Sequence, residues 1–298
     1  MLSSDQIRTF HRDGFVVIPS VLSRGEVLRY RELMKQMFES SPDLSIGDDT
    51  NLRMNAISRY EALAELLFID PVLRSLKSLL GEKFVISPNT MVVDSKYDGW
   101  HTDITTAALA GHTFSNDHAF SVVNAAFYFQ DNGVYGGGLD VVPGSHKRDD
   151  IFLEDIRRKN EAYRNGSLLR SVKSHLRVFI PDFLLRLRRK FLAKNSLSLV
   201  QSAKPGQLTV AQNAGDLLIF DLRLWHKASW AKAPAPIPPD ARKFAYFVIC
   251  GANNETTYKY RDFLIQCSRT EPSYAYLINH KYPEWLCRKA REAGVTLL

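Results

Sequence analysis

The first 80 residues place apolar side chains at helical spacing. Residues 4–13 carry such a stripe and end before Gly14, which is typical of a short capped helix. Residues 61–80 repeat the helical period with one break in the middle. A further helix is predicted between Ser23 and about residue 40, with an apolar stripe of Val27, Tyr30, Leu33, Met34 and Met37.

From residue 84 onward, the pattern changes to short extended segments separated by Gly and Pro turns. Many short strands of this kind favour a double-stranded β-helix, the cupin-like jelly roll. The helices at the two ends would pack outside one sheet, so we predict an all-β core with flanking helices, an α+β fold. The predicted strands are residues 15–19, 84–94, 100–104, 119–130, 207–211, 217–220 and 242–249.

The excess of positive charge is confined to one stretch of the chain, whose formal net charge is +7. Residues 147–200 hold 14 Lys and Arg against 6 Asp and Glu, whereas the rest of the chain holds 25 basic and 26 acidic residues. This stretch interrupts the strands and has helical spacing. We therefore predict a single domain over residues 1–298, with a basic, largely helical insertion at about 147–200.

Two interpretations of this insertion stay open. Charge concentrated beside an apolar face would attract an anionic or lipid-linked substrate, or would hold residues 177–194 against an anionic membrane surface. Equally, the insertion is a solvated lid whose apolar face covers the barrel. Nucleic acid is not expected as a partner, because no binding motif accompanies the charge, and no obligate protein partner is evident.

The composition is typical of a globular protein in a reducing compartment. Three cysteines, without close spacing, predict neither a disulfide framework nor a zinc cluster. Charged residues interrupt the N-terminal stretch before a secretory leader can form, and no apolar run approaches the roughly 18 residues of a membrane span. We expect a cytoplasmic protein.

Three short motifs, far apart in the chain, combine into one candidate iron site. His101 and Asp103 would face the same side of an extended segment, because side chains alternate along a strand. Together with His226 they supply two imidazoles and one carboxylate. This set leaves three metal positions open, as in non-haem Fe(II) oxygenases. Arg242 begins the last predicted strand, and its planar guanidinium would bind a carboxylate through two hydrogen bonds.

These motifs occur in the order typical of the phytanoyl-CoA dioxygenase family of Fe(II)- and 2-oxoglutarate-dependent oxygenases, which the chain resembles. The opening helix, strand and helix look like residues 6–27, and the metal strand looks like residues 100–103. The family's Pro-Gly-Ser-His turn resembles residues 137–146, with Gly137 where Asn is common. Residues 214–226 are similar to the strand that leads to the distal histidine.

The resemblance implies a role for each matching residue. His101, Asp103 and His226 would bind iron. Arg242 would bind the far carboxylate of 2-oxoglutarate, and Met91 matches a position that lines this co-substrate.

The remaining candidates for co-substrate binding are Ser229 and Asn124. The family often has Ser or Thr two residues after the distal histidine, but Ala228 stands there, and Ser229 follows it. Asn124 shares one strand face with Ala126 and Tyr128. We interpret this face as the cavity side, although the opposite assignment fits the spacing equally well.

Other polar residues near these motifs are interpreted as structural. Lys243 and Arg223 are expected to be solvated. His146, which follows Pro143-Gly144-Ser145, is expected to organise its turn.

The resemblance implies an enzyme that uses Fe(II), 2-oxoglutarate and O2 to hydroxylate an unactivated C–H bond of a small or medium-sized organic substrate. Succinate and CO2 would be released. Asp103 favours hydroxylation over halogenation, because the family's halogenases carry a small residue in place of this carboxylate. The competing interpretation is a non-catalytic, basic, membrane-associated or binding protein that retains the jelly-roll fold. No residue identifies the substrate.

Overall fold

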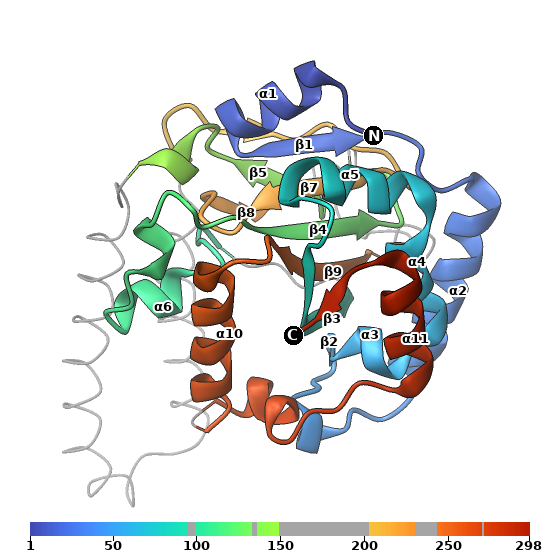
Figure 1. Cartoon of the computed structure of the whole chain (residues 1–298). Coiled ribbons are helices and arrows are strands. Elements are labelled where there is room, and N and C mark those ends of the chain that lie inside the picture. The colour runs from blue at the N-terminus through green and yellow to red at the C-terminus, as the bar shows by residue number, and fades with distance from the viewer. Residues whose placement is uncertain (95–98, 133–135, 149–202, 230–242, 270) are drawn as a thin grey trace, which may run out of the picture.

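The computed structural model describes residues 1–94, 99–132, 136–148, 203–229, 243–269 and 271–298 (Figure 1). Arg242 and nearly all of the basic insertion, including residues 177–194, lie outside the described residues. The single domain and its insertion therefore stay predictions. Among the described residues, no helix has the length and apolar character that crossing a membrane requires.

Eight described α-helices surround the strands. They are α1 (Ser4–Asp13), α2 (Arg24–Glu39), α3 (Ala56–Arg59), α4 (Glu61–Phe68), α5 (Asp70–Leu80), α6 (Thr105–Leu109), α10 (Glu255–Cys267) and α11 (Glu284–Ala293). Short 3-10 turns are η1 (Leu44–Ile46), η2 (Phe114–Asn116), η3 (Ser145–Lys147) and η6 (Pro272–Leu277).

The strands form two sheets within the described part of the chain. The larger sheet has the order β1-β7-β4-β9-β3-β10, with β2 paired to β3, and the smaller sheet has the order β6-β5-β8. The strands are β1 (Phe15–Ile18), β2 (Leu52–Met54), β3 (Val85–Asp94), β4 (Val122–Tyr128), β5 (Leu139–Val141), β6 (Leu208–Thr209), β7 (Leu217–Asp221), β8 (His226–Ala228), β9 (Phe244–Gly251) and β10 (Thr296–Leu297).

The first two long helices begin and end where the sequence signals predict. Ser3 and Gln6 form a capping box at the start of α1, and Gly14 ends the helix with a left-handed φ of 87°. Ser23 and Glu26 form the equivalent box at the start of α2. The predicted helical stretch at 61–80 divides into α4 and α5 at the expected break, because Pro71 suits the first turn of a new helix.

The larger sheet has a helical side and a cavity side. Val123, Ala125 and Phe127 of β4 pack in a core cluster with residues of α2, α4, α5 and α11. Asn124 and Tyr128 lie on the opposite side and line a cavity. Of the two assignments that the spacing left open, the structure has the one in which Asn124 and Tyr128 face the cavity.

Two groups of helices flank this sheet. Figure 1 shows the strands stacked from β1 to β3, with α2, α4 and α11 along one flank and α6 and α10 on the other. Ala107 of α6 and several α10 residues form a second core cluster together with β2 and Ile249. Ile249 and Tyr260 of this cluster also line the cavity.

One predicted strand is wrong. Residues 100–104 contain only a single β-bridge at His101, followed by a turn that leads into α6. Ile104 has φ −101° and ψ 2°, which is turn geometry, and its carbonyl accepts from the Ala108 amide of α6. His101 and Asp103 reach the same point through this turn rather than through strand alternation.

Candidate metal centre

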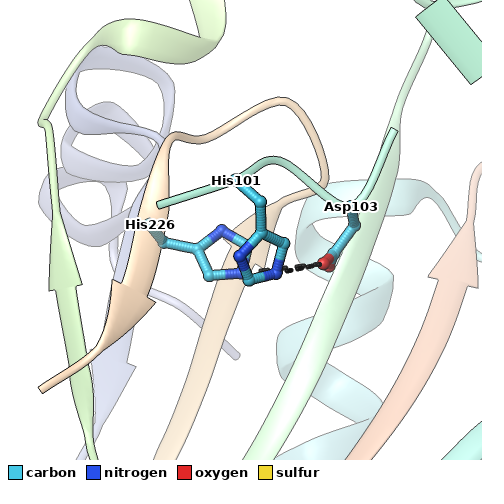
Figure 2. A group of neighbouring side chains, drawn as sticks. All are labelled: His101, Asp103 and His226. Atoms are coloured by element: carbon cyan, nitrogen blue, oxygen red, sulfur yellow. Dashed lines mark ion pairs between the residues drawn. The ribbon is translucent and has the colours of Figure 1, made fainter. Parts of the chain in front are cut away.

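His101, Asp103 and His226 come together between the two sheets. One donor atom from each residue lies within 4.8 Å of the others. The Oδ1 atom of Asp103 is 3.7 Å from His101 Nε2 and 3.6 Å from His226 Nε2. Figure 2 shows the two imidazoles side by side, with the carboxylate directed toward their Nε2 atoms. Three ligands at these separations can bind one ion.

Backbone pairing fixes the separation of the ligands. The His101 amide donates to the His226 carbonyl, and the His226 amide donates to the His101 carbonyl, each over 2.9 Å. The Asp103 amide donates to the Leu222 carbonyl over 3.0 Å, just before β8. The ligands therefore lie on two adjoining backbone segments, although 125 positions separate His101 from His226 in the sequence.

Both histidines present Nε2 to the site in the form that binds a metal. His101 Nδ1 is 2.7 Å from the Gly99 carbonyl oxygen, and His226 Nδ1 is 2.8 Å from the Leu224 carbonyl oxygen. A carbonyl only accepts hydrogen bonds, so each Nδ1 carries a proton, and in the neutral imidazole Nε2 then keeps the lone pair that binds a metal. Such partners orient metal-bound imidazoles and fix their tautomer.

Asn124 orients the carboxylate. Its Nδ2 donates to Asp103 Oδ2 over 3.2 Å, which leaves Asp103 Oδ1 facing the two imidazoles. The Oδ1 of Asn124 is buried and has no hydrogen-bond partner among the described residues. An acceptor of this kind beside the donor set suits a polar ligand in the cavity.

The cavity next to these residues has a volume of about 170 Å³. Met91 and Asn124, two of the candidates for co-substrate binding, line it, and so does Ala228. Three tyrosines line it as well, and burial raises the pKa of their hydroxyls. These hydroxyls are therefore neutral hydrogen-bonding groups at physiological pH: Tyr128, Tyr260 and Tyr274.

The other two candidates for co-substrate binding remain predictions. Arg242 lies outside the described residues. Ser229 is buried, its Oγ has no partner within the described part of the chain, and it is not among the residues that line the cavity. Its backbone pairs with Gly137 and Gly138, which do line the cavity.

The prediction that Lys243 is solvated is wrong. Lys243 lines the cavity, is 4% exposed, and has the pKa of its ammonium lowered to about 8 by burial. The burial of Lys243 was not predicted because it depends on how β9 lies in the sheet. The signal was nonetheless present, because Lys243 has the same strand phase as the cavity residues Ala245, Phe247 and Ile249.

The expectations for Arg223 and His146 have different outcomes. Arg223 is partly buried and forms a two-point ion pair with Asp221, at 2.9 and 2.7 Å, so the expectation of a solvated side chain is wrong. His146 is buried, its Nδ1 has no hydrogen-bond partner among the described residues, and burial lowers the pKa of its imidazole, so its role in organising the turn stays a prediction. In the same turn, Ser145 Oγ accepts from the Trp225 amide over 2.9 Å, next to the ligand His226.

Known proteins resemble this chain along most of its length. An ectoine dioxygenase from Halomonas elongata is 22% identical over 271 residues, which cover 87% of this chain and 73% of that protein. The structure of HygX from Streptomyces hygroscopicus with nickel and 2-oxoglutarate bound has a TM-score of 0.56 at 19% identity, covering 85% of this chain and 88% of that chain. EctD from S. alaskensis with bound Fe has a TM-score of 0.53 at 17% identity, covering 84% and 77%. These likenesses confirm the predicted jelly-roll class.

The family match agrees with the motifs. Residues 10–233 match the phytanoyl-CoA dioxygenase (PhyH) family, a range that contains all three candidate metal ligands. This confirms the family resemblance and the prediction of a dioxygenase. The chain belongs to the phytanoyl-CoA dioxygenase (PhyH) family.

Proposed function

We propose that this protein is an Fe(II)- and 2-oxoglutarate-dependent hydroxylase of a small organic molecule. The single observation that carries the proposal is the convergence of His101, Asp103 and His226 within 4.8 Å at the wall of a cavity. The family match favours this enzyme over a non-catalytic protein that retains the fold. The proposed co-substrates are 2-oxoglutarate and O2.

The residues present fit a divalent iron ion. Two neutral imidazoles and a carboxylate suit this metal, and both Nε2 lone pairs are already directed at the site. Iron held there with 2-oxoglutarate would activate O2 for C–H hydroxylation, with release of succinate and CO2. The chain itself would orient Asp103 through Asn124 and exclude bulk water through the buried aromatic walls of the cavity.

Asp103 supports hydroxylation rather than halogenation. A halogenating site of this type needs a vacant metal position for chloride, which a small residue in place of the carboxylate would provide. Here the carboxylate is present and hydrogen-bonded, so Asp103 would occupy that position on a bound metal.

The cavity favours a compact, polar substrate. Its described lining combines aromatic rings and aliphatic side chains with neutral hydrogen-bonding groups such as Asn89 and Tyr274. An anionic or lipid-linked substrate, and contact of residues 177–194 with a membrane, stay predictions, since they depend on the insertion outside the described residues. A cytoplasmic location stays a prediction too.

The test is anaerobic binding of Fe(II) and 2-oxoglutarate to the purified protein. We expect a weak visible charge-transfer band that appears only when both are present and that is lost in Asp103→Ala. The expected accompanying result is formation of succinate from 2-oxoglutarate on admission of O2. Absence of both metal uptake and the band in the wild type would contradict the proposal.

A further inference from the structure

We propose that the hydroxyl group of Tyr260 donates a hydrogen bond to the substrate, and that it selects an uncharged acceptor such as a ketone, ester or amide carbonyl. This inference rests on the proposed function and deepens it, because it names the chemical class that the substrate must present to the cavity.

The cavity has two ends along β9. Lys243 lines it just before this strand, and Ile249 lines it near the end of the strand. Ile249 packs with Tyr260 of α10, and Tyr274 of η6 packs against the same cluster. Both tyrosines also line the cavity, as Asn89 does. We call the lining formed by Asn89, Ile249, Tyr260 and Tyr274 the tyrosine end.

The tyrosine end lies next to the metal centre. Asn124, which orients Asp103, pairs with Ile249 across β4 and β9. The charge of Asp103 also acts on the hydroxyls of Tyr260 and Tyr274. A molecule bound at the tyrosine end would therefore bring its neighbouring C–H bonds to the metal.

Asn89 is fixed in place by its strand and by a third tyrosine. The pairing of β3 with β9 shifts its register between Ile86 and Thr90, and Asn89 lies in this irregular stretch. Irregularities of this kind change the direction of side chains, and Asn89 lines the cavity. The Tyr276 hydroxyl donates to Asn89 Oδ1 over 3.0 Å. The amide oxygen is therefore occupied, and the NH2 group of Asn89 is available as a donor.

Asn89 in turn determines the direction of the Tyr260 hydroxyl. Burial raises the pKa of Tyr260 well above its usual value, and a hydrogen bond from the Asn89 side chain acts in the opposite direction. A hydrogen bond lowers the pKa of a phenol when the phenol oxygen accepts it. The O–H of Tyr260 itself donates to no described residue. A directed chain therefore runs from Tyr276 through Asn89 to Tyr260 and ends with a donor at the cavity wall.

An uncharged acceptor matches this donor. No described side chain of the tyrosine end carries a positive charge, so a carboxylate buried there would lack a cation. An ammonium group offers only donors, which would leave the Tyr260 hydrogen unpaired. A carbonyl oxygen accepts the hydrogen bond without either cost. Tyr274 stays uncharged as well, because burial raises its pKa to about 12.

The tyrosines come from a part of the chain that the family match does not include. That match covers residues 10–233, whereas Tyr260, Tyr274 and Tyr276 follow it. Substrate choice commonly depends on such additions to a shared fold. The tyrosine end therefore has the chemistry and the place in the chain expected of a specificity element.

Three five-membered rings test the assignment. Cyclopentanone offers only an acceptor, pyrrole is an uncharged donor, and pyrrolidinium is a cationic donor. The protein holds Mn(II) and 2-oxoglutarate without O2, and NMR measures how strongly the bound metal relaxes the protons of each probe. We expect the wild type to bind cyclopentanone in preference to the other two. Tyr260→Phe should lower the affinity for cyclopentanone on the order of 10-fold. Its affinity for 2-oxoglutarate should not change, which shows that the variant is folded.

Tyr258→Phe is the matched control. Tyr258 lies on the same helix, but its hydroxyl donates to Asn253 Oδ1 over 2.9 Å in an exposed position. This variant should bind all three probes as the wild type does. Equal binding of the three probes by the wild type would overturn the proposal, and so would full affinity for cyclopentanone in Tyr260→Phe. A wild type that binds neither Mn(II) nor 2-oxoglutarate would instead refute the proposed function itself.

Asn89→Leu tests the directed chain. Without the amide, the Tyr260 oxygen is free to accept as well as to donate, so the preference for cyclopentanone over pyrrole should shrink. An unchanged preference in Asn89→Leu would overturn the role of Asn89.

Discussion

Asn124 should affect metal binding through the side chain of Asp103, which it orients. Its amide holds Asp103 Oδ2 over 3.2 Å and so fixes which oxygen faces the two imidazoles. We expect Asn124→Ala to weaken Fe(II) or Ni(II) binding by roughly 10- to 100-fold, the range found when partners of metal ligands are removed. Metal affinity is measured by competition with a chelator.

Thermal unfolding of the metal-free Asn124→Ala variant is the control. A melting temperature near that of the wild type separates lost orientation of Asp103 from a general loss of packing. Unchanged metal affinity would show that the backbone alone positions this carboxylate.

The lowered pKa of Lys243 gives a second residue-scale prediction. Burial favours the neutral amine in the ligand-free protein, so the ammonium form is lost as the pH rises through about 8. A dianionic ligand such as 2-oxoglutarate should therefore bind more weakly as the pH rises above about 8, because the cavity lining loses a positive charge. Lys243→Arg should show no such fall, because a guanidinium stays protonated. Among the described residues, the other titratable groups that line the cavity are the metal ligands and three tyrosines with raised pKa values, which stay neutral in this range.

At the scale of elements, the alternation of side chains along a strand predicts which residues share a face only where the strand is long. The residues that share a face of β4 could be predicted because its seven residues alternate without interruption, but which face lines the cavity could not. The short segment at 100–104 could not, because a turn and a strand can both direct His101 and Asp103 to one point. The burial of Lys243 also escaped the sequence, since it depends on the pairing of β9 with β3 and β4.

The smaller sheet contains a buried ion pair that should be important for stability. Lys227 Nζ of β8 lies 2.8 Å from Asp140 Oδ2 of β5, and both side chains are 7% exposed. Asp140→Ala would leave a buried ammonium without its partner, so we expect a loss of about 3–5 kcal/mol in the free energy of unfolding. Denaturant unfolding measures it.

The exposed pair Arg261–Asp262, at 2.7 Å, is the matched control for this experiment. Asp262→Ala should change stability little, because water screens exposed pairs. Equal effects of the two substitutions would contradict a special role of the buried pair.

At the scale of the whole molecule, metal binding should stabilise the fold. A ligand that binds only the folded state adds about 2.7 kcal/mol at a concentration 100 times its dissociation constant. We expect Ni(II) to raise the melting temperature of the wild type and to have no such effect on Asp103→Ala. An equal rise in both proteins would place the stabilising metal elsewhere.

The architecture of the whole molecule was predictable in class but not in detail. The order of the motifs gave the family and the jelly roll, both confirmed here. No sequence pattern predicted the pairing of β10 with β3, because β10 has only two residues, Thr296 and Leu297. The three-stranded sheet depends on contacts between segments far apart in the chain, and local spacing carries no information about those.

The reciprocal backbone bridge between His101 and His226 has a practical consequence. The two imidazoles are held together by main-chain hydrogen bonds that require no ion, so removing the metal should leave the pair in place. Crystals grown without metal should therefore accept iron or nickel by soaking without cracking. The same crystals could then be exposed in turn to 2-oxoglutarate and to trial substrates, which offers a direct route to the molecule that this enzyme oxidises.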